Sequence, residues 1–443
     1  MITYIDLFSG PGGLCTGFKS EGLTPRIAVD FSDFTVKTYA KSHDAEIYEL
    51  DLLLKNIGKL ENVLQKTEKT CVIHGDINQV SNDLITEILK KKFNESSVDI
   101  VTGGAPCESF SMAGKRLEDD KRNDLFSNIL RIGHCVDAKF VMFENVPGLL
   151  TKKRNGKVGG QIEYVFDEFE KENPTTHNHY ILASKDKEVY KCTASDYGTP
   201  QKRERLFIVG CNSKYGFNPF KYPEKTHGKN RKYDAITVED AIRYLPNIES
   251  NAGDEVLDYN PSYEQDYKDG KISEGAYLYY KFILGEDYCE NKNFDKRHIT
   301  YQKSLNHSKK MIRRFENIKQ GEGMQSAVNR LISEGKEYIV KESFPNKIYA
   351  SRNRRLVLTE PSYTVTSHCL DEMVHPIANR QLTPREVARL QGFPDWYIFE
   401  GPYVKFHSDP QQDKYEQIGD AIPVIMAKAL AKSFIEAIKK LKK

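Results

Sequence analysis

The chain opens with Tyr4-Ile5-Asp6-Leu7-Phe8-Ser9-Gly10-Pro11-Gly12-Gly13-Leu14, a short strand pattern that runs into a glycine-rich turn and a helix extending to about Gly22. Glycines let the backbone approach a bound group closely, and the N-terminus of a helix favours negative charge. Asp30 ends the next apolar segment, about 20 residues after Gly10, which is the spacing of a carboxylate that binds ribose hydroxyls. The opening therefore predicts a nucleotide-type site on an α/β fold, although the turn departs from the plain G-x-G-x-x-G pattern.

Short apolar strands continue to alternate with helical stretches up to about residue 212, which is typical of a doubly wound, mostly parallel sheet. Helices are expected over Leu125–Val136 and Ile162–Glu172. The expected strands are Tyr4–Phe8, Arg26–Val29, Val72–His74, Asp99–Thr102, Phe140–Phe143, Val189–Ala194 and Leu206–Gly210. In such folds the functional groups gather at the carboxyl ends of the strands.

Two reactive side chains follow expected strands. Thr102-Gly103-Gly104-Ala105-Pro106-Cys107-Glu108-Ser109-Phe110-Ser111-Met112 sets a cysteine directly behind a proline, and Phe143-Glu144-Asn145-Val146-Pro147 follows a second apolar run. A thiol and a carboxylate at two strand ends suggest attack on a ring that must also be protonated or hydrogen-bonded. Cys107 and Glu144 are therefore the candidate catalytic pair, whereas the remaining cysteines among the eight are expected to be structural.

With these motifs the chain resembles the cytosine-5 DNA methyltransferases. The similar segments, all in the family's order, are Asp6–Gly13, Pro106-Cys107, Glu144–Val146, Gln201 with Arg203 and Arg205, Arg380–Glu386 with Arg389–Pro394, and Gln417–Pro423; Pro361–Thr366 is also family-like. The resemblance covers roughly 1–212 and 376–443. It implies a Rossmann-like, S-adenosylmethionine-dependent methyltransferase fold with a smaller inserted target-recognition domain.

The resemblance also implies a covalent mechanism. Cys107 would add to carbon 6 of cytosine, and Glu144 would hold a proton toward ring nitrogen 3. Arg205 would donate to the cytosine oxygen, whereas Arg203 would orient the site, meet a phosphate or form a structural ion pair. Because a stacked base cannot present carbon 6 to a thiol, the cytosine must be flipped out of duplex DNA at a cost of a few kcal/mol.

The methyl donor implied by the resemblance is S-adenosylmethionine, since the residues alone indicate only a nucleotide-type site. Phe31 is expected either to stack on adenine or to lie in the core, and Asp76 either to meet the adenine or to serve as a turn aspartate. The candidate cofactor contacts are Phe8, Gly10, Gly12, Asp30, Phe31, Asp76, Ile77, Pro106 and Leu125. The cysteines form no cluster with histidine at zinc spacing, so no metal is expected.

Two positions depart from the family pattern. Glu108 follows the cysteine where the family usually has glutamine, and Asp420 stands where it usually has asparagine. An ionised aspartate accepts hydrogen bonds but donates none, which weakens the case for a cofactor contact and leaves helix N-capping open to Asp420. The charged residues 114–123 are expected to form either a mobile cover over the site or a plain surface loop.

The expected division is a catalytic and cofactor-binding domain over 1–215, a target-recognition domain over 216–375, and a segment over 376–443 that returns to the first domain. Regular alternation fades within 216–375, where Thr237–Ile242 reads as a short capped helix. Apolar residues recur at helical spacing in 430–441 and would pack on the first domain. Basic runs at 229–232, 309–314 and 352–355 are either solvated faces or contacts to DNA phosphates.

Composition sets wider bounds. The chain has 443 residues, of which 39% are hydrophobic, enough for two or more domains with a sizeable core. No apolar run reaches the length of a membrane span, the start lacks a secretory pattern, and the scattered cysteines fit a reducing compartment. We expect a cytoplasmic, DNA-associated bacterial protein that works as a monomer without a membrane partner.

The leading hypothesis is a sequence-specific DNA methyltransferase that protects double-stranded DNA from a cognate restriction endonuclease. A tRNA methyltransferase of the same chemistry, a catalytically silent DNA-binding protein and a nicotinamide oxidoreductase are the alternatives. The long interval 216–375 favours a reader of duplex bases, and the presence of Cys107, Glu144 and Arg205 argues against a silent protein. Which bases are read depends on a few side chains in a groove, and the sequence does not indicate them.

Overall fold

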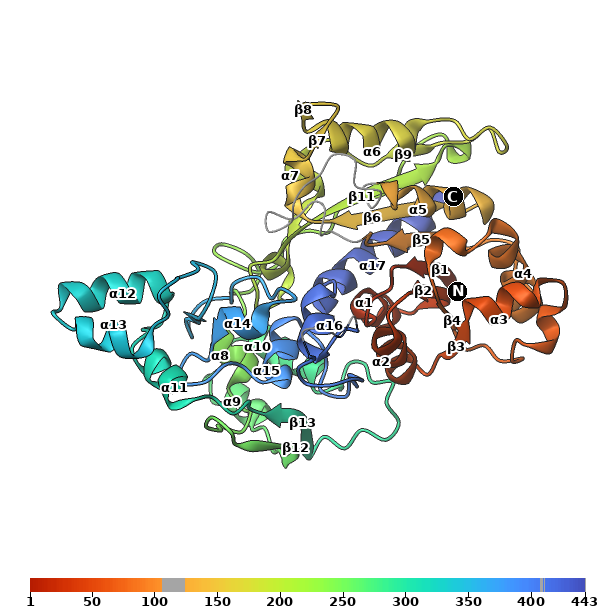
Figure 1. Cartoon of the computed structure of the whole chain (residues 1–443). Coiled ribbons are helices and arrows are strands. Elements are labelled where there is room, and N and C mark those ends of the chain that lie inside the picture. Colours follow the sequence, from red (N-terminus) through yellow and green to blue (C-terminus); the bar gives the residue numbers. More distant parts are fainter. Residues whose placement is uncertain (106–123, 407–408, 410, 443) are drawn as a thin grey trace. The chain divides into compact units, whose positions relative to one another are not determined.

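The computed structural model describes residues 1–105, 124–406, 409 and 411–442 (Figure 1). The chain forms two compact units. Unit 1 comprises Met1–Thr193, Glu204–Glu224 and Val424–Lys443, and unit 2 comprises Ala194–Arg203 and Lys225–Pro423. The chain thus enters unit 1 again at Glu204–Glu224 and at the last helix, whereas 376–423 belongs to unit 2.

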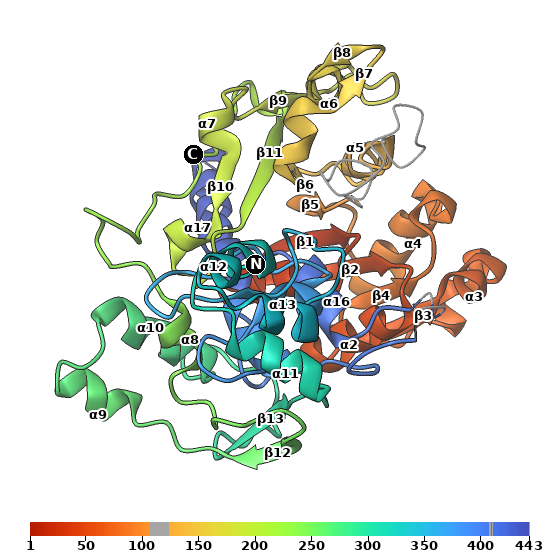
Figure 2. The same cartoon turned by 60° about the vertical axis from the view of Figure 1, so that its left-hand side comes forward.

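Unit 1 is built on a nine-stranded sheet with the order β10-β11-β6-β5-β1-β2-β4-β3, and β9 pairs with β11 (Figure 2). Its strands are β1 (Ile2–Leu7), β2 (Leu23–Asp30), β3 (Glu46–Glu49), β4 (Cys71–His74), β5 (Ile100–Gly103), β6 (Phe140–Asn145), β9 (Tyr180–Leu182), β10 (Lys191–Thr193) and β11 (Glu204–Asn212). Strands β3, β4, β2, β1, β5 and β6 are parallel, whereas β9, β10 and β6 each pair antiparallel with β11. The mostly parallel, doubly wound sheet is therefore confirmed.

Helices connect and cover these strands. They are α1 (Gly13–Lys19), α2 (Asp33–His43), α3 (Leu50–Lys55), α4 (Asn82–Phe93), α5 (Ser127–Cys135), α6 (Gly160–Glu170), α7 (Lys187–Tyr190) and α17 (Val424–Leu441), with 3-10 turns η1 (Ile57–Asn62), η2 (Ile77–Gln79), η4 (Pro147–Thr151) and η6 (Ser213–Tyr215). A two-stranded hairpin, β7 (Lys153–Arg154) with β8 (Lys157–Val158), precedes α6.

The C-terminal helix α17 packs on α1 and confirms the expected link between the chain ends. A Cβ placed on Gly17 would lie 2.5 Å from Val424 O, so only glycine permits this approach of the two helices. The Phe434 ring lies 5.9 Å from the Phe18 ring and 5.7 Å from the Phe140 ring, between centroids. The apolar spacing in 430–441 is thereby explained as a buried stripe.

Two strands of the sheet and one local element differ from the sequence-based prediction. β3 and β9 were not expected, because each has only three or four residues and lies where flanking charges hide the pattern. The expected strand Val189–Ala194 is instead the short helix α7 followed by β10. The helix begins because the Asp186 side chain accepts a hydrogen bond from Glu188 N, a local cap that overrides the β-branched residue Val189.

Unit 2 consists of short elements joined by long loops. They are η5 (Ala194–Tyr197), α8 (Val238–Ile242), β12 (Gly253–Asp258), α9 (Tyr263–Lys268), α10 (Glu274–Ile283), β13 (His298–Lys303), α11 (Lys309–Glu316), α12 (Met324–Ser333), α13 (Glu337–Ser343), β14 (Arg354–Arg355), α14 (Cys369–Glu372), β15 (Met373–Val374), α15 (Pro384–Leu390) and α16 (Lys414–Asp420). The capping box of Thr237 and Asp240 at α8 confirms the expected capped helix. No helix in the described ranges combines the length and apolar character needed to cross a membrane.

Buried charged side chains hold unit 2 together. Arg380 makes a bidentate pair with Glu386 at 2.7 and 2.8 Å, and Arg389 makes one with Asp395 at 2.7 and 3.0 Å. All four side chains are at most 2% exposed. Burial alone would raise the pKa of Glu386, but the neighbouring charges, led by Arg380, lower it to about 2. The family-like segment 380–395 is thus a charged scaffold inside unit 2.

Candidate active site

The carboxyl end of β6 holds Glu144 against Arg205, so two of the predicted catalytic residues lie together. Arg205 Nε lies 2.9 Å from Glu144 Oε1 in an ion pair, and each side chain is 11% exposed. The antiparallel pairing of β11 with β6 sets this contact, since Leu206 lies opposite Asn145 and Phe207 opposite Glu144. An ion pair in so enclosed a position holds one oxygen of the carboxylate toward the guanidinium.

Two neighbours define the space around Glu144. A Cβ placed on Gly104 would lie 2.7 Å from Glu144 Oε2, so this oxygen lies directly over the chain that leaves β5. Asn145 Nδ2 donates to Ala105 O at 3.3 Å, and Asn145 Oδ1 accepts from Val146 N at 2.8 Å. Asn145 thus links the backbone that follows β5 to the backbone that follows β6.

Ala105 is the last described residue before the segment that carries the predicted nucleophile. Pro106, Cys107 and Glu108, together with the cover expected at 114–123, lie outside the described residues. The chain enters that segment from β5, which lies between β1 and β6 in the sheet. Strand β5, which leads to the segment that contains Cys107, therefore lies between β6, which carries Glu144, and β1, which leads to the glycine-rich turn.

The glycine-rich turn is tied to the end of β2 by the Asp30 carboxylate. Gly10 N donates to Asp30 Oδ2 at 2.9 Å, and Ser32 N donates to Asp30 Oδ1 at 3.0 Å. Burial raises the pKa of Asp30, and these backbone hydrogen bonds oppose that effect. A carboxylate offers about four acceptor positions, so two bonds leave capacity for hydroxyl donors.

The backbone of this turn is strained in a way that points to a binding site. Phe8 has a φ of 55°, in the left-handed region that costs a side chain free energy, while Gly10 and Gly12 have φ of 54° and 95°. A Cβ on Gly10 would meet nothing within 4 Å, so open space lies above the turn. Such a surface can receive a flat nucleoside closely.

The remaining cofactor candidates in the described chain lie at neighbouring strand ends. Phe31 is 68% exposed, which excludes the core alternative. Asp76 is exposed and caps η2 by accepting from Asn78 N at 2.9 Å, so the turn role is present. Ile77 belongs to the apolar core of unit 1, and the partly buried Leu125 packs against it.

A buried carboxyl that the sequence did not single out as a site residue lies below the turn. Asp6 is 2% exposed, and its Oδ1 accepts from Thr102 Oγ1 at 2.9 Å. Within the described part of the chain its Oδ2 has no hydrogen-bond partner. Burial raises the pKa of Asp6 to about 7, despite the hydrogen bond from Thr102. Its place inside the β1 motif was the only signal available in the sequence.

Gln201 and Arg203, the first two members of the Gln-x-Arg-x-Arg motif, bind the backbone of 362–366 within unit 2. Val365 N donates to Gln201 Oε1 at 2.7 Å, and Arg203 Nη1 donates to Val365 O. Gln201 Nε2 also donates to Leu390 O at 3.1 Å. Arg203 is 2% exposed, so its guanidinium is a buried support for this segment.

The basic run 352–355 is only partly available to DNA. Arg355 is 5% exposed, and its guanidinium donates to the carbonyls of Phe315, Ile318, His375 and Ala378. Asn353 is equally buried. A phosphate role for the whole run is therefore wrong, because a run of charges along the sequence does not reveal which side chains turn inward. Arg352 stays 52% exposed and lies 3.4 Å from Asp371.

The other two basic runs are more accessible. In α11, Lys309, Lys310 and Arg313 are exposed, whereas Arg314 donates to Ser343 O at 2.9 Å. The cations of 229–232 are exposed as well. These side chains are available for phosphate contacts.

Asp420 does not cap a helix start. It is the last residue of α16, and its carboxylate accepts from Gln412 Nε2 at 2.6 Å. The following helix α17 begins only at Val424. The N-capping alternative is thus excluded.

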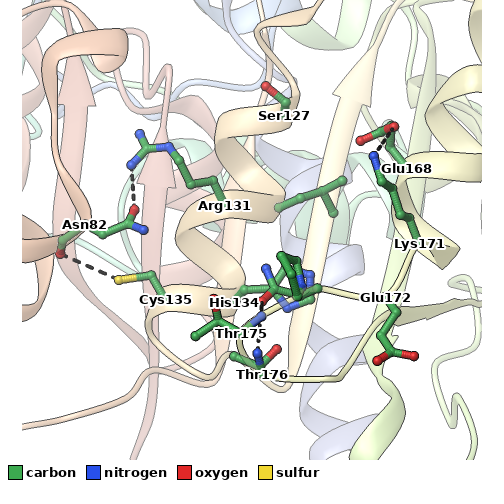
Figure 3. Close-up of a pocket in the computed structure, with 13 residues that line it drawn as sticks. Asn82, Ser127, Arg131, His134, Cys135, Glu168, Lys171, Glu172, Thr175 and Thr176 are labelled. Carbon is green, nitrogen blue, oxygen red and sulfur yellow. Dashed lines mark hydrogen bonds and ion pairs between the residues drawn. The ribbon is translucent and has the colours of Figure 1, made fainter.

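A pocket of about 330 Å³ elsewhere in unit 1 contains none of the predicted site residues (Figure 3). Arg131, His134 and Cys135 of α5 face Glu168 of α6 and Lys171 across it. Burial lowers the pKa of His134 to about 4, so this imidazole is neutral near pH 7. Since α5 ends where β6 begins, His134 and Cys135 lie near the amino ends of the strands, away from Glu144.

Comparison with known proteins gives a consistent result. The family model described as C-5 cytosine-specific DNA methylase matches residues 55–436. The chain is 28% identical over 427 residues to the type II methyltransferase M.DdeI of Desulfomicrobium norvegicum, covering 96% of this chain and 87% of that protein. It is 27% identical to M1.HphI of Haemophilus parahaemolyticus, covering 98% and 87%. A crystal structure described as a prophage-encoded DNA modification methyltransferase (E. coli) shares the fold with a TM-score of 0.67 at 23% identity, covering 99% of this chain and 100% of that one.

Proposed function

The chain belongs to the C-5 cytosine-specific DNA methylase family, and we propose that it methylates carbon 5 of a flipped-out cytosine through a transient bond to Cys107. The observation that carries this proposal is the Glu144–Arg205 pair beside the chain that leaves β5. The pair places the Glu144 carboxyl and the Arg205 guanidinium at the end of β6, next to β5, the strand that leads to Cys107. The enzyme is thus a DNA cytosine-5 methyltransferase for which we assign each residue a role.

Cys107 acts as the nucleophile. Its thiolate adds to carbon 6 of the cytosine, and the electron pair of the 5,6 double bond becomes available at carbon 5. Carbon 5 takes the methyl group, after which the proton on carbon 5 leaves and the carbon–sulfur bond breaks to release the thiolate. S-adenosylmethionine supplies the electrophilic methyl group when it is bound.

Glu144 holds a proton toward ring nitrogen 3 while the ring accepts the thiolate. Arg205 keeps one carboxylate oxygen, Oε1, occupied at 2.9 Å, and this support leaves Oε2 to face the substrate side near Gly104. Arg205 also has further donors in its planar fork for the cytosine oxygen. The pair therefore recognises two adjacent polar atoms of the same ring edge.

Arg203 is a positioning residue in this proposal. Its buried guanidinium and the Gln201 amide hold the backbone of Val365, and neither reaches the reacting ring. Substitution of Arg203 is expected to act through the order of that segment, whereas substitution of Arg205 acts on the base itself.

The residues around the turn after β1 fit S-adenosylmethionine. Asp30 has spare acceptor positions for the ribose hydroxyls, and the open space over Gly10 admits the nucleoside. The exposed Phe31 ring offers a stacking surface for adenine, beside Asp76 and Ile77. We assign Phe8, Gly12, Pro106 and Leu125 to the same site.

Unit 2 is proposed to read the DNA sequence, and its exposed cations on α11 and at 229–232 to meet phosphates. The curated relatives are type II methyltransferases, which supports a role in protecting cytoplasmic DNA from a cognate restriction endonuclease. The same comparisons favour DNA over tRNA as the substrate. We propose that one protomer acts alone.

Parallel transfer of a labelled methyl group to plasmid DNA and to total tRNA tests this function. Label in the plasmid, mapped to carbon 5 of cytosine in one sequence context, is the expected result, and label in tRNA alone would refute it. Glu144→Gln should lower the single-turnover rate by at least 100-fold with little change in DNA affinity, because its proton matters in the chemical step. An equal loss of affinity and rate would contradict that role.

A further inference from the structure

The β7–β8 hairpin has one face fixed to the body of unit 1 and one face turned outward. Lys153 pairs with Val158 and Arg154 with Lys157 across the two strands. Between them Asn155 and Gly156 have φ of 51° and 76°, the left-handed pair of a tight type I′ turn. Since side chains alternate along a strand, Arg154 and Lys157 share one face and Lys153 and Val158 share the other.

The inner face is held by several polar contacts. The Arg154 guanidinium lies 3.5 Å from the centre of the Tyr164 ring, and Arg154 Nη1 donates to Gln161 Oε1 at 3.1 Å. Lys157 Nζ lies 2.6 Å from Glu163 Oε2. Stacking plus paired charges makes this short hairpin a fixed projection beside α6, at the margin of unit 1 in both views (Figure 1, Figure 2).

The outer face combines an unpaired cation with an exposed apolar side chain. Lys153 is exposed and has no ion-pair partner in the ranges that the structure describes. Val158 beside it is 61% exposed. Neither side chain contributes to the core, so the stability of unit 1 does not explain them.

The hairpin lies next to the site. The short turn η4 joins β6, which ends just after Glu144, to the hairpin. Arg154 Nη1 also donates to Asp124 Oδ1 at 3.1 Å, and Asp124 is the first described residue after the segment that carries Cys107 in the sequence. The hairpin therefore follows within a few residues of the strand end that carries Glu144.

We infer that the β7–β8 hairpin is a DNA contact, in which Lys153 meets a backbone phosphate of the substrate duplex and Val158 packs against the adjoining sugar. The inference rests on the proposed function, since it assigns a second contact to the same substrate. Lysine and phosphate are complementary in charge, and backbone contacts of this kind fix the register of the duplex without reading its bases. An apolar side chain beside the cation suits the sugar surface.

The test compares Lys153→Ala, Lys153→Glu and Lys153→Arg with Lys90→Ala. Lys90 is an exposed lysine in the last turn of α4, the helix that leads to the amino end of β5, and it has no ion pair among the described residues. The affinity of each protein is measured between 50 and 200 mM salt for two duplexes of equal length. One contains the sequence that the enzyme methylates, and the other has an unrelated sequence. Loss of one phosphate contact should make the plot of log affinity against log salt less steep by about 0.9. The ratio of wild-type affinity to Lys153→Ala affinity should therefore fall about 3.5-fold between 50 and 200 mM salt.

Three results support the inference together: a reduced slope for Lys153→Ala, a larger loss of affinity for Lys153→Glu, and wild-type behaviour of Lys153→Arg and Lys90→Ala. Val158→Ala should weaken binding without changing the slope. If Lys153→Ala and Lys153→Glu keep the wild-type slope, the hairpin does not touch DNA and the inference is refuted. Because methyl transfer by the wild type is scored separately, such a result leaves the proposed function standing.

Discussion

Unit 1 and unit 2 both bury apolar clusters, but unit 2 also buries bidentate arginine–carboxylate pairs whose side chains are at most 2% exposed. Unit 1 has a continuous apolar core that includes Ile5, Leu7 and Val101, and its site residues lie where the strands end. Unit 2 buries Arg380 and Arg389 in bidentate pairs with carboxylates and uses Arg355 to bind four carbonyls. Apolar periodicity specifies the first kind of structure. The second depends on individual polar partners, which lie six residues away for Arg380 and Arg389 and 20 to 40 residues away for Arg355.

The largest expected effect tests whether the chemistry resides in unit 1. Cys107→Ser should abolish methyl transfer while DNA affinity stays within about tenfold of the wild type, because the nucleophile's main role lies in the chemical step. Single-turnover transfer and equilibrium binding to the same duplex measure the two quantities. Turnover of Cys107→Ser near the wild-type rate would contradict the assignment. Lys90→Ala serves as the control and should keep both the wild-type rate and the wild-type DNA affinity.

The next effect concerns the buried charges of unit 2. Arg389→Met should lower the free energy of unfolding by about 3–5 kcal/mol, because Asp395 would be left buried with only the longer contact to Arg385 Nη1, at 3.6 Å. The fluorescence of Trp396, the one tryptophan of the chain and 1% exposed in unit 2, reports this unfolding directly.

Two controls sharpen that measurement. Ile129→Val in the apolar core of unit 1 should cost only about 0.5–1.5 kcal/mol. The double variant Arg389→Met with Asp395→Leu should recover only part of the loss. An apolar pair can replace a buried ion pair, but the buried Arg385 also loses its contact with Asp395. A loss for Arg389→Met no larger than that for Ile129→Val would remove the contrast between the units.

A smaller and pH-dependent effect is expected from Asp6, the buried carboxyl of unit 1. Its pKa of about 7 lies above the value near 4 for an unfolded chain, so the native state binds the proton more tightly. The resulting stabilisation, of the order of a few kcal/mol, is complete below about pH 4 and is lost as the pH rises through 7. Asp6→Asn should remove this dependence, as measured by hydrogen exchange of β1 amides from pH 5 to 8. An identical pH profile in both proteins would show that Asp6 does not titrate in this range.

The smallest effect separates two arginines of the same basic run. Arg352→Ala should reduce the salt slope of DNA binding by about 0.9 if this exposed side chain meets a phosphate. Arg355→Met should leave the slope unchanged and lower the stability of unit 2 instead, because its partners are carbonyls. A slope that falls only in Arg355→Met would reverse the assignment.

These arginines illustrate how far the sequence could be read. The parallel sheet, the turn at Gly10 and the α17 stripe follow from local patterns, and the sequence predicted them. The motifs predicted Glu144 and Arg205 as site residues but not the ion pair between them. The inward turn of Arg355 and the binding of Val365 by Gln201 depend on tertiary contacts between distant residues. The edge strands β3 and β9 were missed because three or four residues carry too little periodicity.

The central claim is that Cys107 bonds to carbon 6 of the target cytosine, and covalent trapping tests it most directly. A duplex whose target cytosine carries fluorine at carbon 5 is incubated with the wild-type enzyme and S-adenosylmethionine, and the product is digested and analysed by mass spectrometry. Fluorine cannot leave as a proton does, so the account predicts a stable adduct of the methylated base on the peptide containing Cys107. Absence of that adduct, under conditions in which the unsubstituted duplex is methylated, would contradict it.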